Sequence, residues 1–193
     1  MTYNRTAMRY LFVADGRSPI AQNWIRYFAE RGDEVYLAST FACSVDFPLR
    51  GVEIIPVAFS GFRKGTQKPG TAPAQTLGLR TAIRQWFGPL TIRRAAERLR
   101  SFIERVKPDL VHAMRIPYEG MLAADAYMGI PLIVSTWGND FTLHAPSTRL
   151  MSHYTRWTMK VANAIHADCQ RDVRLAKEWG FEVGGPALVA PGN

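Results

Sequence analysis

The sequence predicts an α/β protein with a Rossmann-like, doubly wound and mainly parallel sheet that carries helices on both faces. Short apolar runs alternate with helix-length amphipathic stretches, which is the pattern of repeated βαβ units. In the central unit, the apolar runs at residues 110–113 and 132–134 flank a helix-length stretch that ends at Gly129. Because 193 residues fit one domain with a real core, we expect a single domain over residues 1–193.

The first third of the chain contains three expected strands and one helix. A flat apolar run at residues 9–14 predicts the first strand, and Ser18-Pro19 then supplies a helix cap and a suitable first helical residue. That helix should end near Arg31, with Gly32 closing it. The runs at residues 34–39 and 52–57 predict the next two strands.

The remaining elements continue the alternation. We expect a polar loop at residues 60–78, a helix at 79–90 that breaks at Gly88-Pro89, and a helix at 91–106 with a clean apolar stripe. After the central unit, the expected elements are a helix at 148–161, a strand at 164–167, a helix at 170–179 and a short strand at 187–190.

Parallel strands end at a common edge of the sheet, and ligands of open α/β sheets bind along that edge. Right-handed crossovers place the first, fourth and fifth strands at the middle of the sheet. Three loops should therefore converge there, at residues 15–18, 112–115 and 137–140.

The first loop, Asp15-Gly16-Arg17-Ser18, precedes a helix N-terminus, which suits a phosphate or a hydroxyl group, and Arg17 can add charge. We interpret Gly16, Arg17 and Ser18 as substrate-binding residues. The alternative is a tight turn that only caps the helix. The loop is neither the dinucleotide fingerprint nor a P-loop, so NAD and ATP have little support.

The second loop offers His112 and Arg115. His112 at a strand end is a candidate catalytic residue that orients or polarises a substrate hydroxyl, although a lone histidine on an apolar strand is also typical of a hydrogen-bonded core. Arg115 can grip a phosphate or carboxylate with its planar fork, and the alternative is a solvated surface position.

The third loop, Trp137-Gly138-Asn139-Asp140, carries an aromatic plane, a flexible glycine and two polar side chains. These residue types suit a sugar or polyol, which stacks on the aromatic ring and hydrogen-bonds at its rim. We interpret Trp137, Gly138 and Asn139 as substrate-binding and Asp140 as a candidate catalytic residue. The alternative is that Asp140 only caps the following turn.

The composition narrows the classes of function. The four histidines and two cysteines show no metal-ligand spacing and no nucleophile triad, so we predict no metal and no cofactor. Cys43 and Cys169 lie far apart in sequence, which favours a reduced, cytoplasmic protein over a disulfide scaffold. No apolar run is long enough to span a membrane, and no signal peptide is visible. The net charge of +8 indicates an anionic partner, and no nucleic-acid module is visible.

Basic residues concentrate between Ser60 and Leu110. With Trp86 and Phe87 on an adjacent apolar face, the first half of this region has the pattern of an interfacial helix that docks on anionic lipid at the inner membrane face. The alternative is that the apolar face packs on the sheet and the arginines are solvated.

Several segments together resemble the N-terminal half of family 4 glycosyltransferases, retaining enzymes built from two Rossmann-like domains in the GT-B architecture. The segments that carry the resemblance, in chain order, are Asp15-Gly16, Arg31-Gly32-Asp33-Glu34-Val35, Lys107-Pro108-Asp109-Leu110-Val111-His112-Ala113, Gly129-Ile130-Pro131-Leu132-Ile133-Val134-Ser135-Thr136-Trp137-Gly138-Asn139-Asp140, Ala162-Asn163-Ala164-Ile165-His166-Ala167-Asp168 and Val189-Ala190-Pro191-Gly192-Asn193.

The resemblance implies transfer of a sugar, with retention, from a nucleotide-diphosphate sugar to an acceptor, usually without an essential metal. It implies that the acceptor is held mostly by this domain and the donor mostly by a C-terminal domain. By position, Gly16 and Arg17 fall in the family's glycine-rich turn, His112 in its strand-end histidine motif, and residues 137–140 in its His-Gly-Ser/Thr-Asp motif.

The sequence departs from the family pattern at three positions. The usual two-glycine turn has only Gly16, a second histidine after the fourth strand is replaced by Met114, and the histidine before Gly138 is replaced by Trp137. The donor-binding domain would follow a linker like Pro191-Gly192-Asn193. We therefore expect a fragment that binds an acceptor, small or lipid-linked, and does not catalyse alone.

A different class of function stays open at this point. The alternative hypothesis is a complete, non-catalytic module that recognises an anionic glycan, lipid or protein surface through its basic residues. The two hypotheses differ in turnover, since only the enzyme transfers or hydrolyses a sugar nucleotide once a donor-binding half is supplied.

Overall fold

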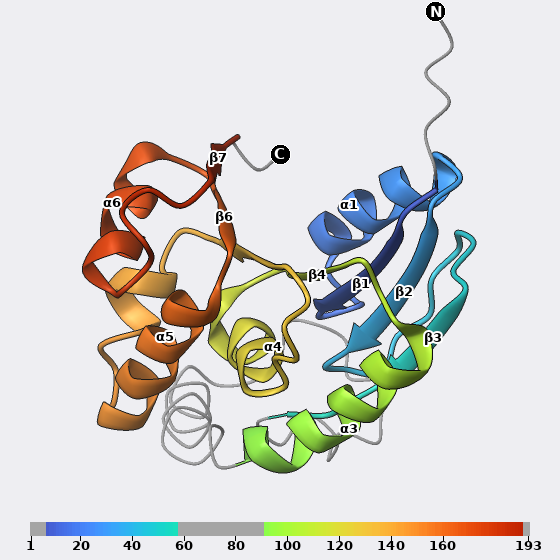
Figure 1. Cartoon of the computed structure of the whole chain (residues 1–193), viewed down its shortest axis with the longest axis horizontal. Helices are drawn as coiled ribbons and strands as arrows, with labels where there is room; N and C mark the ends of the chain where they lie inside the picture. Colours follow the sequence, from blue (N-terminus) through green and yellow to red (C-terminus); the bar gives the residue numbers. More distant parts are fainter. Residues whose placement is uncertain (1–6, 58–90, 191–193) are drawn as a thin grey trace, which may run out of the picture.

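The computed structural model describes residues 7–57 and 91–190, in which seven parallel strands form one sheet in the order β3-β2-β1-β4-β5-β6-β7 (Figure 1). The helices and wide helical turns of this part are α1 (Pro19–Glu30), α3 (Ile92–Val106), η3 (Ile116–Gly120), α4 (Met121–Asp125), η4 (Asp140–His144), α5 (Arg149–Val161) and α6 (Gln170–Glu178). The strands are β1 (Arg9–Ala14), β2 (Glu34–Ser39), β3 (Gly51–Ile54), β4 (Leu110–Ala113), β5 (Leu132–Thr136), β6 (Ala164–Ala167) and β7 (Ala187–Val189).

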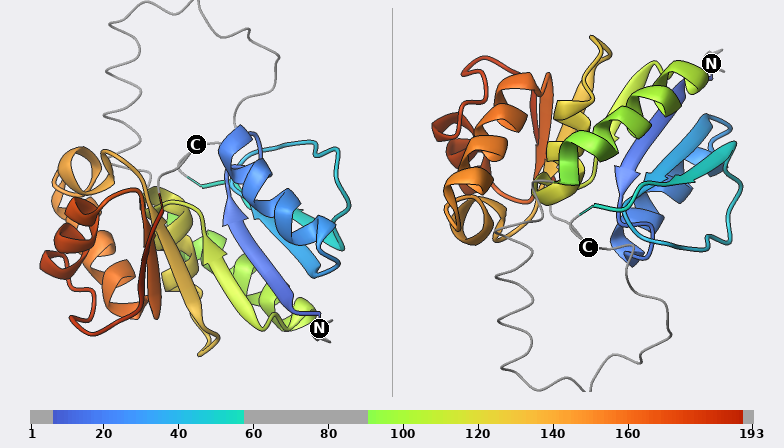
Figure 2. Two further views of the ribbon diagram at one scale, coloured as in Figure 1. Left: turned by 90° about the horizontal axis from the view of Figure 1, so that it is seen from above. Right: turned by 90° about the horizontal axis from the view of Figure 1, so that it is seen from below.

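The arrangement confirms the predicted Rossmann-like fold, with β1, β4 and β5 at the middle of the sheet. Helix α1 covers one face, where Ile25 packs in a cluster with Phe12. Helices α3, α4, α5 and α6 contribute to the core on the other face, where Leu99 and Val173 join the cluster that contains Val13 (Figure 2). Side chains of β1 alternate between these two clusters, as the pleat of a strand buried on both faces requires.

Helix α1 begins and ends at the residues that the sequence predicts. The hydroxyl of Ser18 accepts a hydrogen bond from the Ala21 N–H at 3.4 Å, and Pro19 is the first helical residue. Gly32 has a φ of +85°, a conformation that a residue without Cβ adopts at little cost. The cap fixes the turn between β1 and α1, and this turn borders the site described below.

Helix α3 is the described part of the basic stretch. Its apolar stripe, including Leu99 and Phe102, is buried against the sheet, as predicted for the helix at residues 91–106. The expected loop at residues 60–78 and the expected helix at 79–90, with Trp86 and Phe87, lie outside the described residues.

The third strand is shorter than predicted. It ends at Ile54, although the fully buried Ile55 still donates its N–H to the Ser39 carbonyl at 2.8 Å. The next residue is Pro56, which has no N–H to extend the ladder, so the pairing stops there.

The helix expected after β4 begins late. Pro117 has a ψ of 120° and Tyr118 has a φ of +69° and a ψ of −53°, so the chain makes a wide turn before helix α4 starts at Met121. This turn points residues that the sequence placed on a helix toward the carboxyl edge of the sheet. It is the main structural difference from the prediction.

Candidate functional site

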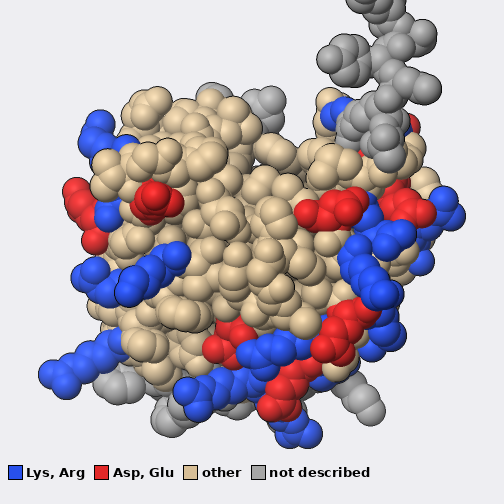
Figure 3. Space-filling view, in the orientation of Figure 1, with Lys and Arg blue, Asp and Glu red and all other residues tan. Residues whose placement is uncertain are grey.

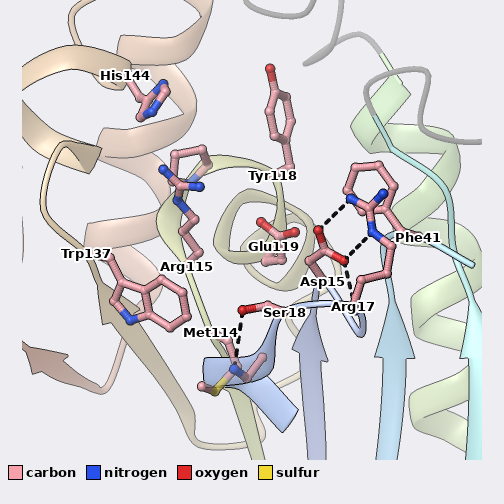
Figure 4. A pocket seen from close by; sticks show the side chains of 12 residues that line it. Asp15, Arg17, Ser18, Phe41, Met114, Arg115, Tyr118, Glu119, Trp137 and His144 are labelled. Atoms are coloured by element: carbon pink, nitrogen blue, oxygen red, sulfur yellow. Dashed lines mark hydrogen bonds and ion pairs between the residues drawn. The ribbon is translucent and has the colours of Figure 1, made fainter. Parts of the chain in front are cut away.

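A cavity of about 410 Å³ opens at the carboxyl ends of strands β1, β2, β4 and β5 (Figure 4). Apolar and aromatic side chains share its wall with ionisable ones. The lining residues are Asp15, Arg17, Ser18, Ala21, Phe41, Met114, Arg115, Pro117, Tyr118, Glu119, Trp137 and His144. Residues from all three predicted loops thus line one cavity, together with Phe41 from the loop after β2.

The first loop presents a closed ion pair to the cavity. Arg17 donates from Nε to Oδ1 of Asp15 at 2.9 Å and from Nη2 to Oδ2 at 2.8 Å, so the carboxylate occupies its fork. The guanidinium also lies over the Phe41 ring, 3.5 Å from its centroid. Ser18 lines the cavity while it caps α1.

Gly16, in the same loop, is buried and does not line the cavity. Its N–H donates to the Ser39 hydroxyl at 3.0 Å. A Cβ at this position would lie 2.4 Å from Sγ of Cys43 and 2.8 Å from Oγ of Ser39. Gly16 is therefore needed for close packing between the first loop and the loop after β2, which positions Arg17 and Phe41.

Asp140 joins the second and third loops. Its side chain is 1% exposed and accepts hydrogen bonds from Nε of Arg115 at 2.9 Å, the Trp137 N–H at 3.2 Å and the Ile116 N–H at 3.3 Å. Burial raises the pKa of this carboxyl, while Arg115 and the two amides oppose the rise. Asp140 does not line the cavity, so its position suits orienting Arg115 and Trp137 rather than touching substrate.

The rest of the third loop divides between the cavity and its surroundings. Trp137 lines the cavity, whereas Gly138 and Asn139 are exposed and do not. Gly138 has a φ of +44°, and its carbonyl accepts from Nη2 of Arg171 at 3.1 Å. Of the three residues predicted to bind substrate in this loop, the cavity includes one.

His112 lies below the cavity in the sheet. It is 5% exposed, and its Nε2 lies 2.9 Å from the Ser135 hydroxyl, which is also 3.2 Å from Nδ1 of His166. Burial, together with the proximity of His166, lowers the pKa of His112 to about 3, so its ring is neutral at physiological pH. This placement matches the hydrogen-bonded core histidine that we gave as the alternative to a catalytic role.

Glu119 is an ionisable lining residue that the sequence analysis did not single out. It is 6% exposed, and its Oε1 accepts from the Thr40 hydroxyl at 2.7 Å. Burial raises its pKa to about 7, although the bond from Thr40 and the charge of Arg115 oppose the rise. In the sequence Glu119 looks like a solvated helical residue, and only the turn at Tyr118 brings it into the cavity.

Outside the cavity, basic and acidic side chains mix along the edge of the molecule that α3 occupies (Figure 3). Arg98 donates to the Ile54 carbonyl at 2.9 Å, and Arg105 pairs with Glu53. Among residues 7–57 and 91–190, no cluster of three or more histidine, cysteine or carboxylate side chains is placed to hold a metal ion. No helix in these ranges has both the length and the apolar character to cross a membrane.

The fold and the cavity define an α/β protein with a lined cavity at the carboxyl edge of a parallel sheet. The family model described as a glycosyl transferase 4-like domain matches residues 15–192, so the chain belongs to this family. Family membership confirms the resemblance seen in the sequence and supports glycosyl transfer as the general class of activity. No curated protein matches the chain.

Two solved structures match the chain over most of its length. The UDP-GlcNAc 2-epimerase from Neisseria meningitidis, bound to UDP-GlcNAc, has a TM-score of 0.52 at 13% identity over 93% of this chain and 44% of its own. The calicheamicin glycosyltransferase CalG4 has a TM-score of 0.48 at 14% identity over 97% of this chain and 52% of its own. At such identity the likeness to the epimerase shows the fold alone. The chain spans about half the length of each of these two proteins.

Proposed function

We propose that this domain binds the acceptor of a retaining glycosyltransferase of GT-B type, whose donor is a nucleotide-diphosphate sugar held mainly by a second domain. Family membership supports sugar transfer, and the resemblance of the sequence to family 4 enzymes supports the GT-B architecture, retention and the division between the domains. The chain alone would then bind an acceptor without turning it over.

The observation that carries the proposal is the convergence of three loops on one cavity. Trp137 offers a ring face for stacking on a sugar, and the ionisable groups at Arg115 and Glu119 offer hydrogen bonds to its substituents. In the reaction, an acceptor oxygen bonds to the anomeric carbon of the donor, the bond from that carbon to the diphosphate breaks, and the hydroxyl proton leaves with the diphosphate. The residues of this chain would hold the acceptor hydroxyl near the donor.

Calorimetric titration of the chain with monosaccharides and with UDP tests the binding step. We expect Trp137→Ala and Arg115→Ala to weaken sugar binding about tenfold or more without unfolding the domain. Trp157→Ala is the matched control, because Trp157 is 44% exposed on α5 and does not line the cavity. Unchanged binding in the two cavity variants would refute the site.

Transfer itself is tested by supplying a donor-binding domain and following the product by mass spectrometry. We expect a new glycoside with the anomeric configuration of the donor. A chain that binds glycans at full strength, yet never supports transfer with any nucleotide sugar, would instead be the non-catalytic module.

A further inference from the structure

Two arginine side chains line the cavity, and they differ in how many of their guanidinium nitrogens donate hydrogen bonds within the chain. Arg17 uses Nε and Nη2 on Asp15, so its fork is filled from within the chain. Arg115 uses Nε alone on Asp140. Within residues 7–57 and 91–190, the two Nη groups of Arg115 have no hydrogen-bond partner, although its side chain is 41% exposed and lines the cavity.

Asp140 fixes the orientation of the Arg115 guanidinium. Asp140 is almost fully buried and also holds the amides of Ile116 and Trp137, so it cannot follow a moving arginine. Anchored at Nε, the guanidinium presents its Nη edge to the open space that Tyr118 and His144 border, away from the Asp15 and Arg17 pair (Figure 4). A planar fork with two free donors in a fixed orientation matches a carboxylate or phosphate.

The neighbouring charges leave this fork available. Asp15 is already paired with Arg17. Glu119 bonds to Thr40 and forms no ion pair with Arg115 in the described residues, and its raised pKa keeps a share of it uncharged near neutral pH. Arg115 is thus ion-paired with Asp140 through Nε alone, and no side chain in the described part of the chain accepts from its two Nη groups.

We propose that the open edge of Arg115 binds an oxyanion of the acceptor, so that this enzyme glycosylates an acidic sugar or a phosphorylated polyol rather than a neutral one. The ring of such an acceptor would lie on the apolar wall formed by Met114, Pro117 and Trp137. This inference rests on the proposed function, because it names the substrate class of that same cavity. The donor diphosphate has the same chemistry, so the test must separate the two sources.

The test is calorimetric titration of the 193-residue chain with glucose, glucuronate, glucose 6-phosphate and UDP. Glucuronate and glucose differ only at C6, where a carboxylate replaces the hydroxymethyl group. We expect glucuronate or glucose 6-phosphate to bind roughly tenfold tighter than glucose or more, and Arg115→Ala to abolish this preference. Arg115→Lys keeps the charge without the fork and should retain only part of it.

Arg94→Ala serves as the matched control, because Arg94 is exposed on α3 and its loss removes one positive charge away from the cavity. Equal affinity of the chain for glucose and its charged counterparts would overturn the acidic acceptor and leave the proposed function standing. If Arg115→Ala weakens UDP as much as glucose 6-phosphate, the oxyanion belongs to the donor and the assignment to the acceptor fails. If no sugar binds, both proposals fail.

Discussion

The hydroxyl of Thr40 lies 2.7 Å from Oε1 of Glu119 and joins the end of β2 to the turn that precedes α4. This hydrogen bond opposes the effect of burial on the carboxyl but does not cancel it, since the pKa of Glu119 rises to about 7. The groups that face it are Thr40, Asp15 and Arg115. Glu119 therefore carries a proton in a pH range where most carboxyls have lost theirs.

That proton makes stability depend on pH in a defined direction. Between the ordinary pKa of 4.5 and the folded value of about 7, the native state holds a proton that the unfolded chain releases. The free energy of unfolding should therefore fall as pH rises through this window, by up to about 3 kcal/mol, and level off above it. Glu119→Gln keeps the bond to Thr40 and should remove this contribution.

The measurement is urea unfolding of both proteins at pH 5 and pH 8. We expect the wild type to lose more stability than Glu119→Gln between the two conditions, while other titrating groups cancel in the comparison. Glu97→Gln, on the exposed face of α3, is the control and should behave like the wild type. The same loss in all three proteins would contradict a buried, protonated Glu119.

Gly16→Ala tests the packing below the first loop. The new Cβ would meet Cys43 and Ser39 at distances that no native contact shows, so we expect a loss of about 1 to 3 kcal/mol in unfolding free energy. Because the displaced loop carries Arg17, cavity binding should weaken as well. Gly184→Ala is the matched control, since nothing lies within 4 Å of a Cβ there.

A second variant identifies the cause. Cys43→Ala removes Sγ, the nearest clashing atom, and should restore part of the stability of Gly16→Ala in the double variant. If the two changes add without any rescue, close approach to Cys43 is not the reason for the glycine.

Tyr118 holds a positive φ that is strained for a residue with a side chain, and strain of this kind clusters at functional sites. Tyr118→Gly and Tyr118→Ala both remove the ring from the cavity, but only glycine relieves the backbone. We expect the glycine variant to be more stable than the alanine variant by about 1 kcal/mol or more in thermal or urea unfolding. Equal stability would show that the turn is not strained.

The sequence predicted the strands and the long helices well because their signals are local. Ser18 with Pro19 marked a helix start, and flat apolar runs marked strands that are buried on both faces. The sequence does not predict the late start of α4. A positive φ is normally signalled by a glycine, and here the residue with that backbone conformation is Tyr118.

The same limit applies to the site. Sheet topology correctly brought Arg17, Arg115 and Trp137 to one cavity, since the ends of neighbouring parallel strands must meet. The catalytic hypothesis for His112 depended on which way a strand residue points, and its partner Ser135 belongs to a different strand. The contribution of Glu119 depended on a turn and on a hydroxyl from the loop after β2, neither of which spacing reveals.

Variants of Asp140 test whether this residue positions Arg115 for ligand binding or only stabilises the fold. Its carboxylate accepts from the Arg115 side chain and from the Trp137 backbone N–H at once, so Asp140→Ala should cost about 2 to 4 kcal/mol of stability and release the Arg115 side chain and the backbone of the third loop. If Asp140 acts through Arg115, the Arg115→Ala change should weaken glucuronate binding much less in the Asp140→Ala background than in the wild type. A double-mutant cycle of the two changes, followed by calorimetry, measures this coupling. Asp140→Asn keeps an oxygen acceptor for Arg115 and should recover part of the glucuronate binding with little loss of stability. A purely structural role for Asp140 predicts instead that the two losses in the cycle are additive. It also predicts that the folded Asp140→Ala and Asp140→Asn proteins bind glucuronate with equal affinity.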